Sequence, residues 1–88
     1  MLEIDYTKKF LKDAQRLERR GKNMDRLGHV VTLLSEQENI PPRYHNHKLS
    51  GNWQDYWELH IEPDWLLIYE TDETTLFLAR TGTHADLF

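Results

Sequence analysis

Apolar residues near the start of the chain recur at helical spacing in two stretches that a glycine separates. Before them, residues 2–6 alternate apolar and polar positions and predict a short strand. Thr7 suits the N-cap of a helix over residues 8–20, and Gly21 suits the residue that ends it. A second helix is predicted over residues 23–37, and the short connection favours an antiparallel helical hairpin.

From residue 56 the pattern changes to that of strands. Residues 56–62 alternate, with Trp57, Leu59 and Ile61 on one face. Two further strands follow, over residues 65–70 and 75–80, joined by polar turns. The predicted order is β-α-α-β-β-β, an α+β fold in which the helical hairpin packs on a small antiparallel sheet.

Length and composition predict one small domain over residues 1–88. Of these residues 39% are hydrophobic and 30% are charged, as in a globular protein. No apolar run has the length that a bilayer needs, and no signal peptide pattern opens the sequence. The chain has no cysteine, which excludes disulfides and thiolate chemistry and fits a cytoplasmic protein.

Charge is distributed unevenly. Residues 1–48 hold ten Lys/Arg and seven Asp/Glu, and residues 49–88 hold one and eight, giving about +3 and −7. Six cations share one face of the first predicted helix, and they are either a solvated face or a surface for a polyanion. They are Lys8, Lys9, Lys12, Arg16, Arg19 and Arg20.

The C-terminal segment has unusual chemistry for a chain end. Arg80 closes the last predicted strand, and His84 follows it by four residues. His60 and Asp64 come from the end of one strand and the following turn, and the antiparallel order can bring them close to Arg80 and His84. His47 lies in a polar loop. Each could be an ordinary surface group, since strands carry polar pairs and Asp is common in turns.

Together these side chains suit cleavage of an RNA phosphodiester without a metal ion. Attack by a ribose 2′-hydroxyl needs a base, an acid and a cation for the charge that develops on phosphorus. Histidine titrates near neutral pH and suits the first two roles, while arginine has a planar fork that matches phosphate oxygens. We expect no metal site, since no helical His-x-x-x-His spacing occurs and His45 and His47 form a loop pair without an evident third ligand. No glycine pattern for a nucleotide cofactor occurs either.

Three blocks of the C-terminal half resemble the YafQ-type branch of the RelE/ParE toxin superfamily. They are His47-x-Leu49-x-Gly51-x-Trp53, then His60-Ile61-Glu62-Pro63-Asp64-Trp65, then Arg80-Thr81-Gly82-Thr83-His84 with Leu87-Phe88 at the end. The N-terminal half resembles this branch more loosely, through its first strand and the starts of its helices. The resemblance therefore covers essentially the whole chain.

The resemblance implies a toxin of a bacterial type II toxin-antitoxin system that enters the ribosomal A site and cleaves mRNA there. It implies a cognate antitoxin as partner, and rRNA and mRNA of the 30S A site as ribosomal contacts. By position, His47, His60, Asp64 and His84 match the catalytic set and Arg80 the phosphate-binding arginine; Trp65 and Phe88 match substrate-contacting residues. We expect His84 to be the general acid, and His47 to be the base ahead of Asp64 or a His60–Asp64 pair.

Two features depart from the family pattern. Trp57 stands where relatives often carry a basic residue, and the sequence pI is about 5.7, whereas these toxins are usually basic. Since polyanion affinity rests on phosphate neutralisation, we expect weak activity on free RNA and docking through the cations of the first helix. The alternatives are a ParE-like gyrase inhibitor without nuclease activity, an inactive antitoxin-binding module and a ribosome-independent RNase.

Overall fold

Both predicted helices are present in the computed structural model, which describes residues 1–88. Helix α1 spans Lys8–Arg19, and the Thr7 hydroxyl accepts a hydrogen bond from the Phe10 amide at its N-terminus. Gly21 follows with a φ of 87°, which few residues other than glycine adopt readily. Helix α2 spans Met24–Ser35 and starts from an Asn23 cap.

The strands form one sheet in the order β1-β5-β4-β3-β2. Their bounds are β1 Glu3–Tyr6, β2 His47–Lys48, β3 Trp57–Glu62, β4 Trp65–Thr71 and β5 Thr75–Gly82. The sheet is mixed, since β1 pairs with β5 in parallel while every other pair is antiparallel. The α+β architecture is confirmed. Four short elements were not predicted: strand β2, the 3-10 helices η1 (Pro42–Tyr44) and η2 (Gly51–Trp53), and helix α3 (His84–Leu87).

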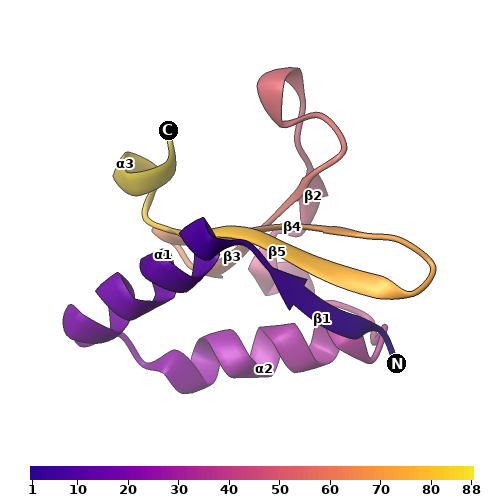
Figure 1. The fold of residues 1–88 in the computed structure, drawn as a ribbon, viewed down its shortest axis with the longest axis horizontal. Coiled ribbons are helices and arrows are strands. Elements are labelled where there is room, and N and C mark those ends of the chain that lie inside the picture. Colours follow the sequence, from indigo (N-terminus) through magenta and orange to yellow (C-terminus); the bar gives the residue numbers. More distant parts are fainter.

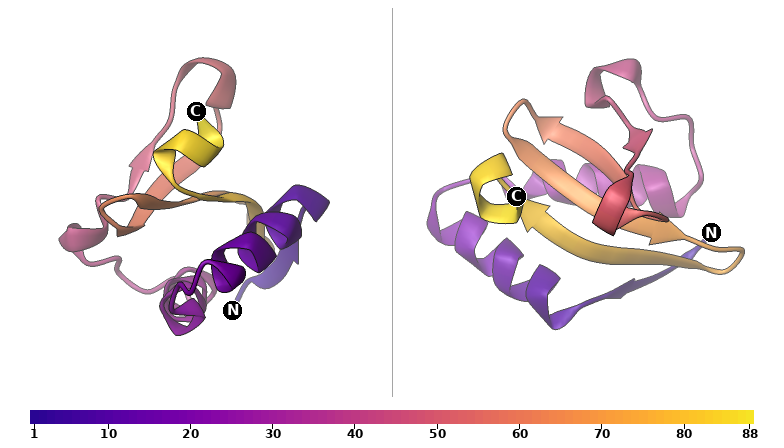
Figure 2. Two further views of the ribbon diagram at one scale, coloured as in Figure 1. Left: turned by 90° about the vertical axis from the view of Figure 1, so that its left-hand side faces the viewer. Right: turned by 90° about the horizontal axis from the view of Figure 1, so that it is seen from above.

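The helical hairpin covers one face of the sheet, while α3 and the β2–η2 segment stand on the opposite face (Figures 1 and 2). The main core lies between the hairpin and the sheet and includes Leu17, Val30, Leu59, Leu67 and Leu76. A smaller apolar cluster lies on the opposite face, made of Leu66, Ile68, Ala79 and Leu87. This second cluster seats α3 on the sheet. None of the helices has the length and apolar composition that crossing a bilayer requires.

The alternation predicted for residues 56–62 stops after His60. The β3–β4 register shifts between His60 and Glu62, and the Glu62 carboxylate accepts hydrogen bonds from Lys22 (2.9 Å) and Arg26 (3.2 Å) of the hairpin. Glu62 therefore lies on the helical side, not beside His60 as the pattern predicted. A register irregularity moves a side chain to the other face, which a period-2 pattern does not reveal.

Candidate active site

Strand register places several candidate residues in one row on the open face of the sheet. His47 pairs with Glu58, Glu58 with Ile68, and Ile68 with Arg80, which makes one row across four strands. Cross-strand partners share a face, and neighbouring strands are about 4.8 Å apart, so the backbones of Glu58 and Arg80 are about 10 Å apart. His60 pairs with Leu66, and Leu66 with Gly82, so His60 lies beside the end of β5 that leads to His84.

His84 and Asp64 form a direct pair at the end of this face. The Asp64 carboxylate accepts hydrogen bonds from the His84 imidazole Nδ1 (2.6 Å) and the His84 backbone N–H (2.9 Å). The backbone hydrogen bond first, and the imidazole second, lower the pKa of Asp64. An ionised Asp64 thus fixes the proton on Nδ1 and leaves Nε2 of His84 for a substrate.

The predicted His60–Asp64 pair is not formed, because His60 takes Glu58 as its partner. The Glu58 carboxylate lies 2.8 Å from His60 Nε2 and 3.5 Å from His47 Nε2. Glu58 is only 7% exposed, since two histidines and the sheet cover it. The one sequence signal for Glu58 was the alternation that put it on the face of His60.

His47 is held from its other side as well. Its Nδ1 lies 2.7 Å from the backbone carbonyl oxygen of His45, so Nδ1 donates and Nε2 faces the site. The pairing of β2 with β3 brings this residue, expected in a loop, beside Glu58.

The imidazoles continue as a chain of ring contacts. The centroid of His60 lies 6.0 Å from that of His47 and 5.8 Å from that of His84. The structure therefore gathers His47, His60 and His84 with Asp64, although His47 and His84 belong to opposite ends of the C-terminal half.

Arg80 is held by a carboxylate that the sequence pattern did not reveal. Asp13 of α1 is 2% exposed and accepts hydrogen bonds from Arg80 Nε (2.7 Å) and Nη2 (3.1 Å). This side-chain hydrogen bond raises the pKa of Arg80 above its ordinary value. The pair occupies one edge of the guanidinium and leaves Nη1 free for an anion. Asp13 lies beside the cationic face of its helix, and its local pattern gave no sign of this contact.

Helix α3 is anchored to the end of α1. Arg20 donates to Asp86 from both terminal nitrogens (2.8 and 3.3 Å), and Thr83 and Asp86 form a capping box. The Arg20 hydrogen bond first, and the Thr83 amide second, hold the pKa of Asp86 well below its usual range. The Thr83-x-x-Asp86 spacing was the available signal. These contacts fix the segment that carries His84.

The two aromatic residues expected to touch substrate have different environments. Trp65 is 0% exposed in the main core, where its indole N–H donates to Thr81 Oγ1 (3.0 Å). The prediction that Trp65 contacts substrate is therefore wrong for this conformation, because its ring faces the hairpin. Phe88 is 61% exposed, and its ring lies 6.0 Å from that of Trp53 on the open face.

The cationic face of α1 is partly neutralised within the fold. Arg16 pairs with Asp13 and Arg20 with Asp86, whereas the other four cations are exposed and form no ion pair. These four are Lys8, Lys9, Lys12 and Arg19. They constitute the surface left for a polyanion.

His47, Glu58 and His60 could together hold a metal ion. One ligand atom from each lies within 4.8 Å of the others, and two imidazoles with a carboxylate suit a transition metal. His45 is not part of this set. His47 joins Glu58 and His60 of β3 only through strand pairing, which the sequence pattern did not reveal.

The chain is similar to known proteins over nearly its whole length. The family model described as "Bacterial toxin of type II toxin-antitoxin system, YafQ" matches residues 2–88. The mRNA interferase toxin YafQ of Escherichia coli K12 is 40% identical over 87 residues, 98% of this chain and 95% of the relative.

Two solved structures are also similar over nearly the whole chain. The toxin chain of the E. coli DinJ-YafQ toxin-antitoxin complex superposes with a TM-score of 0.91 and 40% identity, over 99% of this chain and 97% of that one. A metal-bound toxin from Helicobacter pylori gives a TM-score of 0.93 and 41% identity, with full coverage of both chains.

Proposed function

The chain belongs to the YafQ family of bacterial type II toxins, and we propose that it is an mRNA interferase that cuts messages in the ribosomal A site. The observation that carries the proposal is the His84 imidazole, held by Asp64 and in ring contact with His60, on the face that also presents Arg80. A gyrase inhibitor or an inactive binding module needs no such acid–base set.

The reaction is an internal transesterification of RNA. The 2′-hydroxyl loses its proton and its oxygen attacks the adjacent phosphorus. The bond from phosphorus to the 5′-oxygen then breaks, and that oxygen takes up a proton. The products are a 2′,3′-cyclic phosphate and a free 5′-hydroxyl, and no oxidant, reductant or water is consumed.

His84 acts as the general acid. Asp64 holds its Nδ1–H, so a protonated imidazole presents Nε2–H to the leaving 5′-oxygen. A positioned acid of this kind contributes about 10²–10⁴-fold to the rate. The exposure of His84 suits a group that must meet a large substrate.

Arg80 stabilises the charge on the phosphorane oxygens. Asp13 binds the Nε edge of the guanidinium, which orients its free Nη1 donors. Hydrogen-bond donors that are fixed before reaction stabilise the transition state without reorganisation.

His47 is the first choice for the general base. Its Nδ1–H is held by the His45 carbonyl, so Nε2 carries the lone pair of the neutral ring. Glu58 positions His60 through a carboxylate contact of 2.8 Å. The same carboxylate lies 3.5 Å from His47 Nε2 and stabilises that ring once it has taken up the proton. Asp64 is less suited to the role, because both of its hydrogen bonds orient His84.

The reaction proceeds without a metal ion in this proposal. The set of His47, Glu58 and His60 could bind one, and a toxin relative has been solved with bound metal. Occupation would take up the His47 nitrogen that we assign to the general base. Added chelator is therefore expected to leave the rate unchanged, and a metal that binds these groups is expected to inhibit.

The partners follow from the same assignment. E. coli YafQ forms a complex with DinJ, and this chain is expected to bind a cognate antitoxin that silences it. Ribosome docking is assigned to the four unpaired cations of α1 facing rRNA. The protein acts in the cytoplasm, where translation takes place.

The test compares wild type with His84→Ala after induction from a tight promoter. Message 5′ ends are mapped with and without translation of the message. Cuts locked to the reading frame, present in wild type and lost in His84→Ala, are the expected result. Cuts in untranslated RNA would indicate an RNase that does not need the ribosome. If growth stops without any cuts, and also stops in His84→Ala, the protein does not act as a nuclease.

A further inference from the structure

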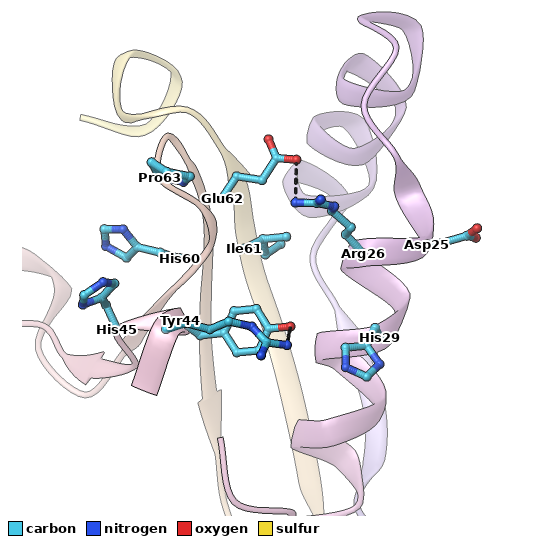
Figure 3. Close-up of a pocket in the computed structure, with 10 residues that line it drawn as sticks. Asp25, Arg26, His29, Tyr44, His45, His60, Ile61, Glu62 and Pro63 are labelled. Atoms are coloured by element: carbon cyan, nitrogen blue, oxygen red, sulfur yellow. Dashed lines mark hydrogen bonds and ion pairs between the residues drawn. The ribbon is translucent and has the colours of Figure 1, made fainter. Parts of the chain in front are cut away.

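A groove of about 860 Å³ opens beside His60 at the edge of the sheet (Figure 3). It exists because β2 pairs only with Trp57 and Glu58, so the outer edge of β3 beyond Glu58 has no partner strand. Helix α2 and the segment around η1 form its other walls. Its polar lining includes Arg26, His29, Arg43, Tyr44, His45 and His60.

One wall of the groove carries a cation held against an aromatic ring. The Arg43 guanidinium lies over the Tyr44 ring, 4.8 Å from its centroid, and Nη2 donates to the Tyr44 hydroxyl (3.2 Å). Tyr44 is 8% exposed and fixed in the core, whereas Arg43 is exposed and forms no ion pair. The guanidinium is thus positioned by the ring and keeps its charge.

The rest of the lining carries charges of both signs, including the exposed carboxylate of Asp25, which forms no ion pair. Arg26 is paired with Glu62 (3.2 Å), as Figure 3 shows, and the same carboxylate also pairs with Lys22 (2.9 Å). His29 and His45 are exposed and offer ring nitrogens. His60 lines the groove and also contacts His84, so the groove is continuous with the candidate active site.

We infer that this groove binds one nucleotide of single-stranded RNA next to the scissile phosphate, with its base stacked on the Arg43 guanidinium. The inference rests on the proposed function. Unpaired bases stack on aromatic rings and on arginine planes, and their exposed edges take hydrogen bonds from nearby side chains. A volume in the range of small-molecule pockets accommodates such a group.

A segment of antitoxin is the other class of partner that a groove at an open strand edge could bind. RNA is favoured because the exposed Arg43 guanidinium lies against the Tyr44 ring and because the groove opens on His60. The groove would then contribute to the choice of codon, since only bases that fit it position the phosphate at His84.

The test uses ribosomes programmed with defined A-site codons. Arg43→Ala removes the stacking plane, Arg43→Lys keeps only the charge, and Lys48→Ala is the matched control. Lys48 is an exposed cation of β2 that does not line the groove. Thermal unfolding and antitoxin affinity are measured for each variant.

For Arg43→Ala we expect KM to rise about 5-fold or more, because the contact with one stacked base is lost. The kcat should stay within about 2-fold of wild type. The distribution of cut sites among codons should flatten. Arg43→Lys should resemble Arg43→Ala, and Lys48→Ala should resemble wild type.

Unchanged KM and cut sites in Arg43→Ala would overturn the inference and leave the proposed function intact. Full rescue by Arg43→Lys would also overturn it, since charge alone would then suffice. Loss of antitoxin affinity with unchanged RNA kinetics would assign the groove to the antitoxin instead. A wild type that cuts no message would overturn both proposals.

Discussion

Asp64 and His84 are joined by two hydrogen bonds to the same oxygen, Oδ1, one from the imidazole and one from the backbone amide. One carboxylate therefore sets both the ring orientation of His84 and the start of α3. Both hydrogen bonds lower the pKa of Asp64, so the pair stays intact at neutral pH and is lost on acidification only below the ordinary Asp range.

Replacing Asp64 should slow cleavage more than it weakens binding. Asp64→Ala leaves the imidazole free to rotate, so we expect kcat to fall by about 10- to 100-fold, part of what a general acid supplies. Asp64→Asn keeps an acceptor oxygen and should lose less. Single-turnover cleavage on programmed ribosomes gives kcat and KM. A rise in KM with unchanged kcat would indicate that Asp64 binds substrate and does not orient His84.

Asp13 should matter for both stability and rate. Asp13→Ala removes the buried acceptor of Arg80 and should cost about 1.5–3 kcal/mol in the free energy of unfolding. The rate should fall as well, because the guanidinium is no longer fixed. Glu18→Gln, an exposed acid of the same helix, is the control and should change neither quantity. Urea unfolding measures stability, and cleavage assays measure the rate. An Asp13→Ala variant with wild-type stability and full activity would refute the role of Asp13 in fixing Arg80.

The link between α1 and α3 should depend on pH through Asp86. Its pKa is lowered in the folded state, so its ionised form stabilises the fold above the ordinary Asp value of about 4. That contribution decreases as pH falls below this value toward the lowered pKa. We expect Asp86→Asn to be less stable than wild type by about 1 kcal/mol at pH 7, with the difference shrinking below about pH 4.

Urea titrations at several pH values would check this difference. Glu73→Gln, in the exposed β4–β5 turn, is the control and should match wild type throughout. A difference that grew on acidification would contradict the assignment.

Gly82 leaves room for the Asp86 side chain. Its φ is 157°, and a Cβ at this position would lie 3.0 Å from Asp86 Cβ and Oδ2. Gly82→Ala should therefore lower stability by about 1–3 kcal/mol and reduce cleavage by displacing α3.

Gly28→Ala is a control that should raise stability, whereas Gly82→Ala should lower it. Gly28 lies inside α2, and a methyl group added there would have no neighbour within 4 Å, so alanine should stabilise the helix by about 0.5–1 kcal/mol. Thermal unfolding of both variants tests the pair. Equal effects of the two alanines would rule out a specific Gly82–Asp86 contact.

Ribosome affinity should depend on the unpaired cations of α1. Reversing Lys12 and Arg19 to glutamate should weaken binding and reduce the slope of log affinity against log salt. Arg16 is less informative, because it pairs with Asp13 and its loss would also disturb Arg80. Sedimentation binding at several salt concentrations measures the effect. If ribosome binding at low salt is unchanged, these cations form only a solvated face of α1.

The local elements of the fold could be predicted from the amino-acid pattern. Apolar spacing predicted both helices, and Thr7 and Gly21 predicted the ends of the first one. Alternation predicted β3, and the polar turns marked the bounds of β4 and β5. These features depend on neighbours within a few residues, which is why periodicity and capping residues predict them. The resemblance of three short sequence blocks to the toxin family identified the candidate catalytic residues.

Which groups meet one another was settled by packing in three dimensions. Strand register placed Glu58 between two histidines, a bulge moved Glu62 to the hairpin, and Trp65 faces the core instead of the open face. Asp13 and Arg80 meet across 67 positions of sequence. Such contacts follow from how helices and strands pack over long separations, and a one-residue shift in register would exchange the faces, so no local pattern could reveal them.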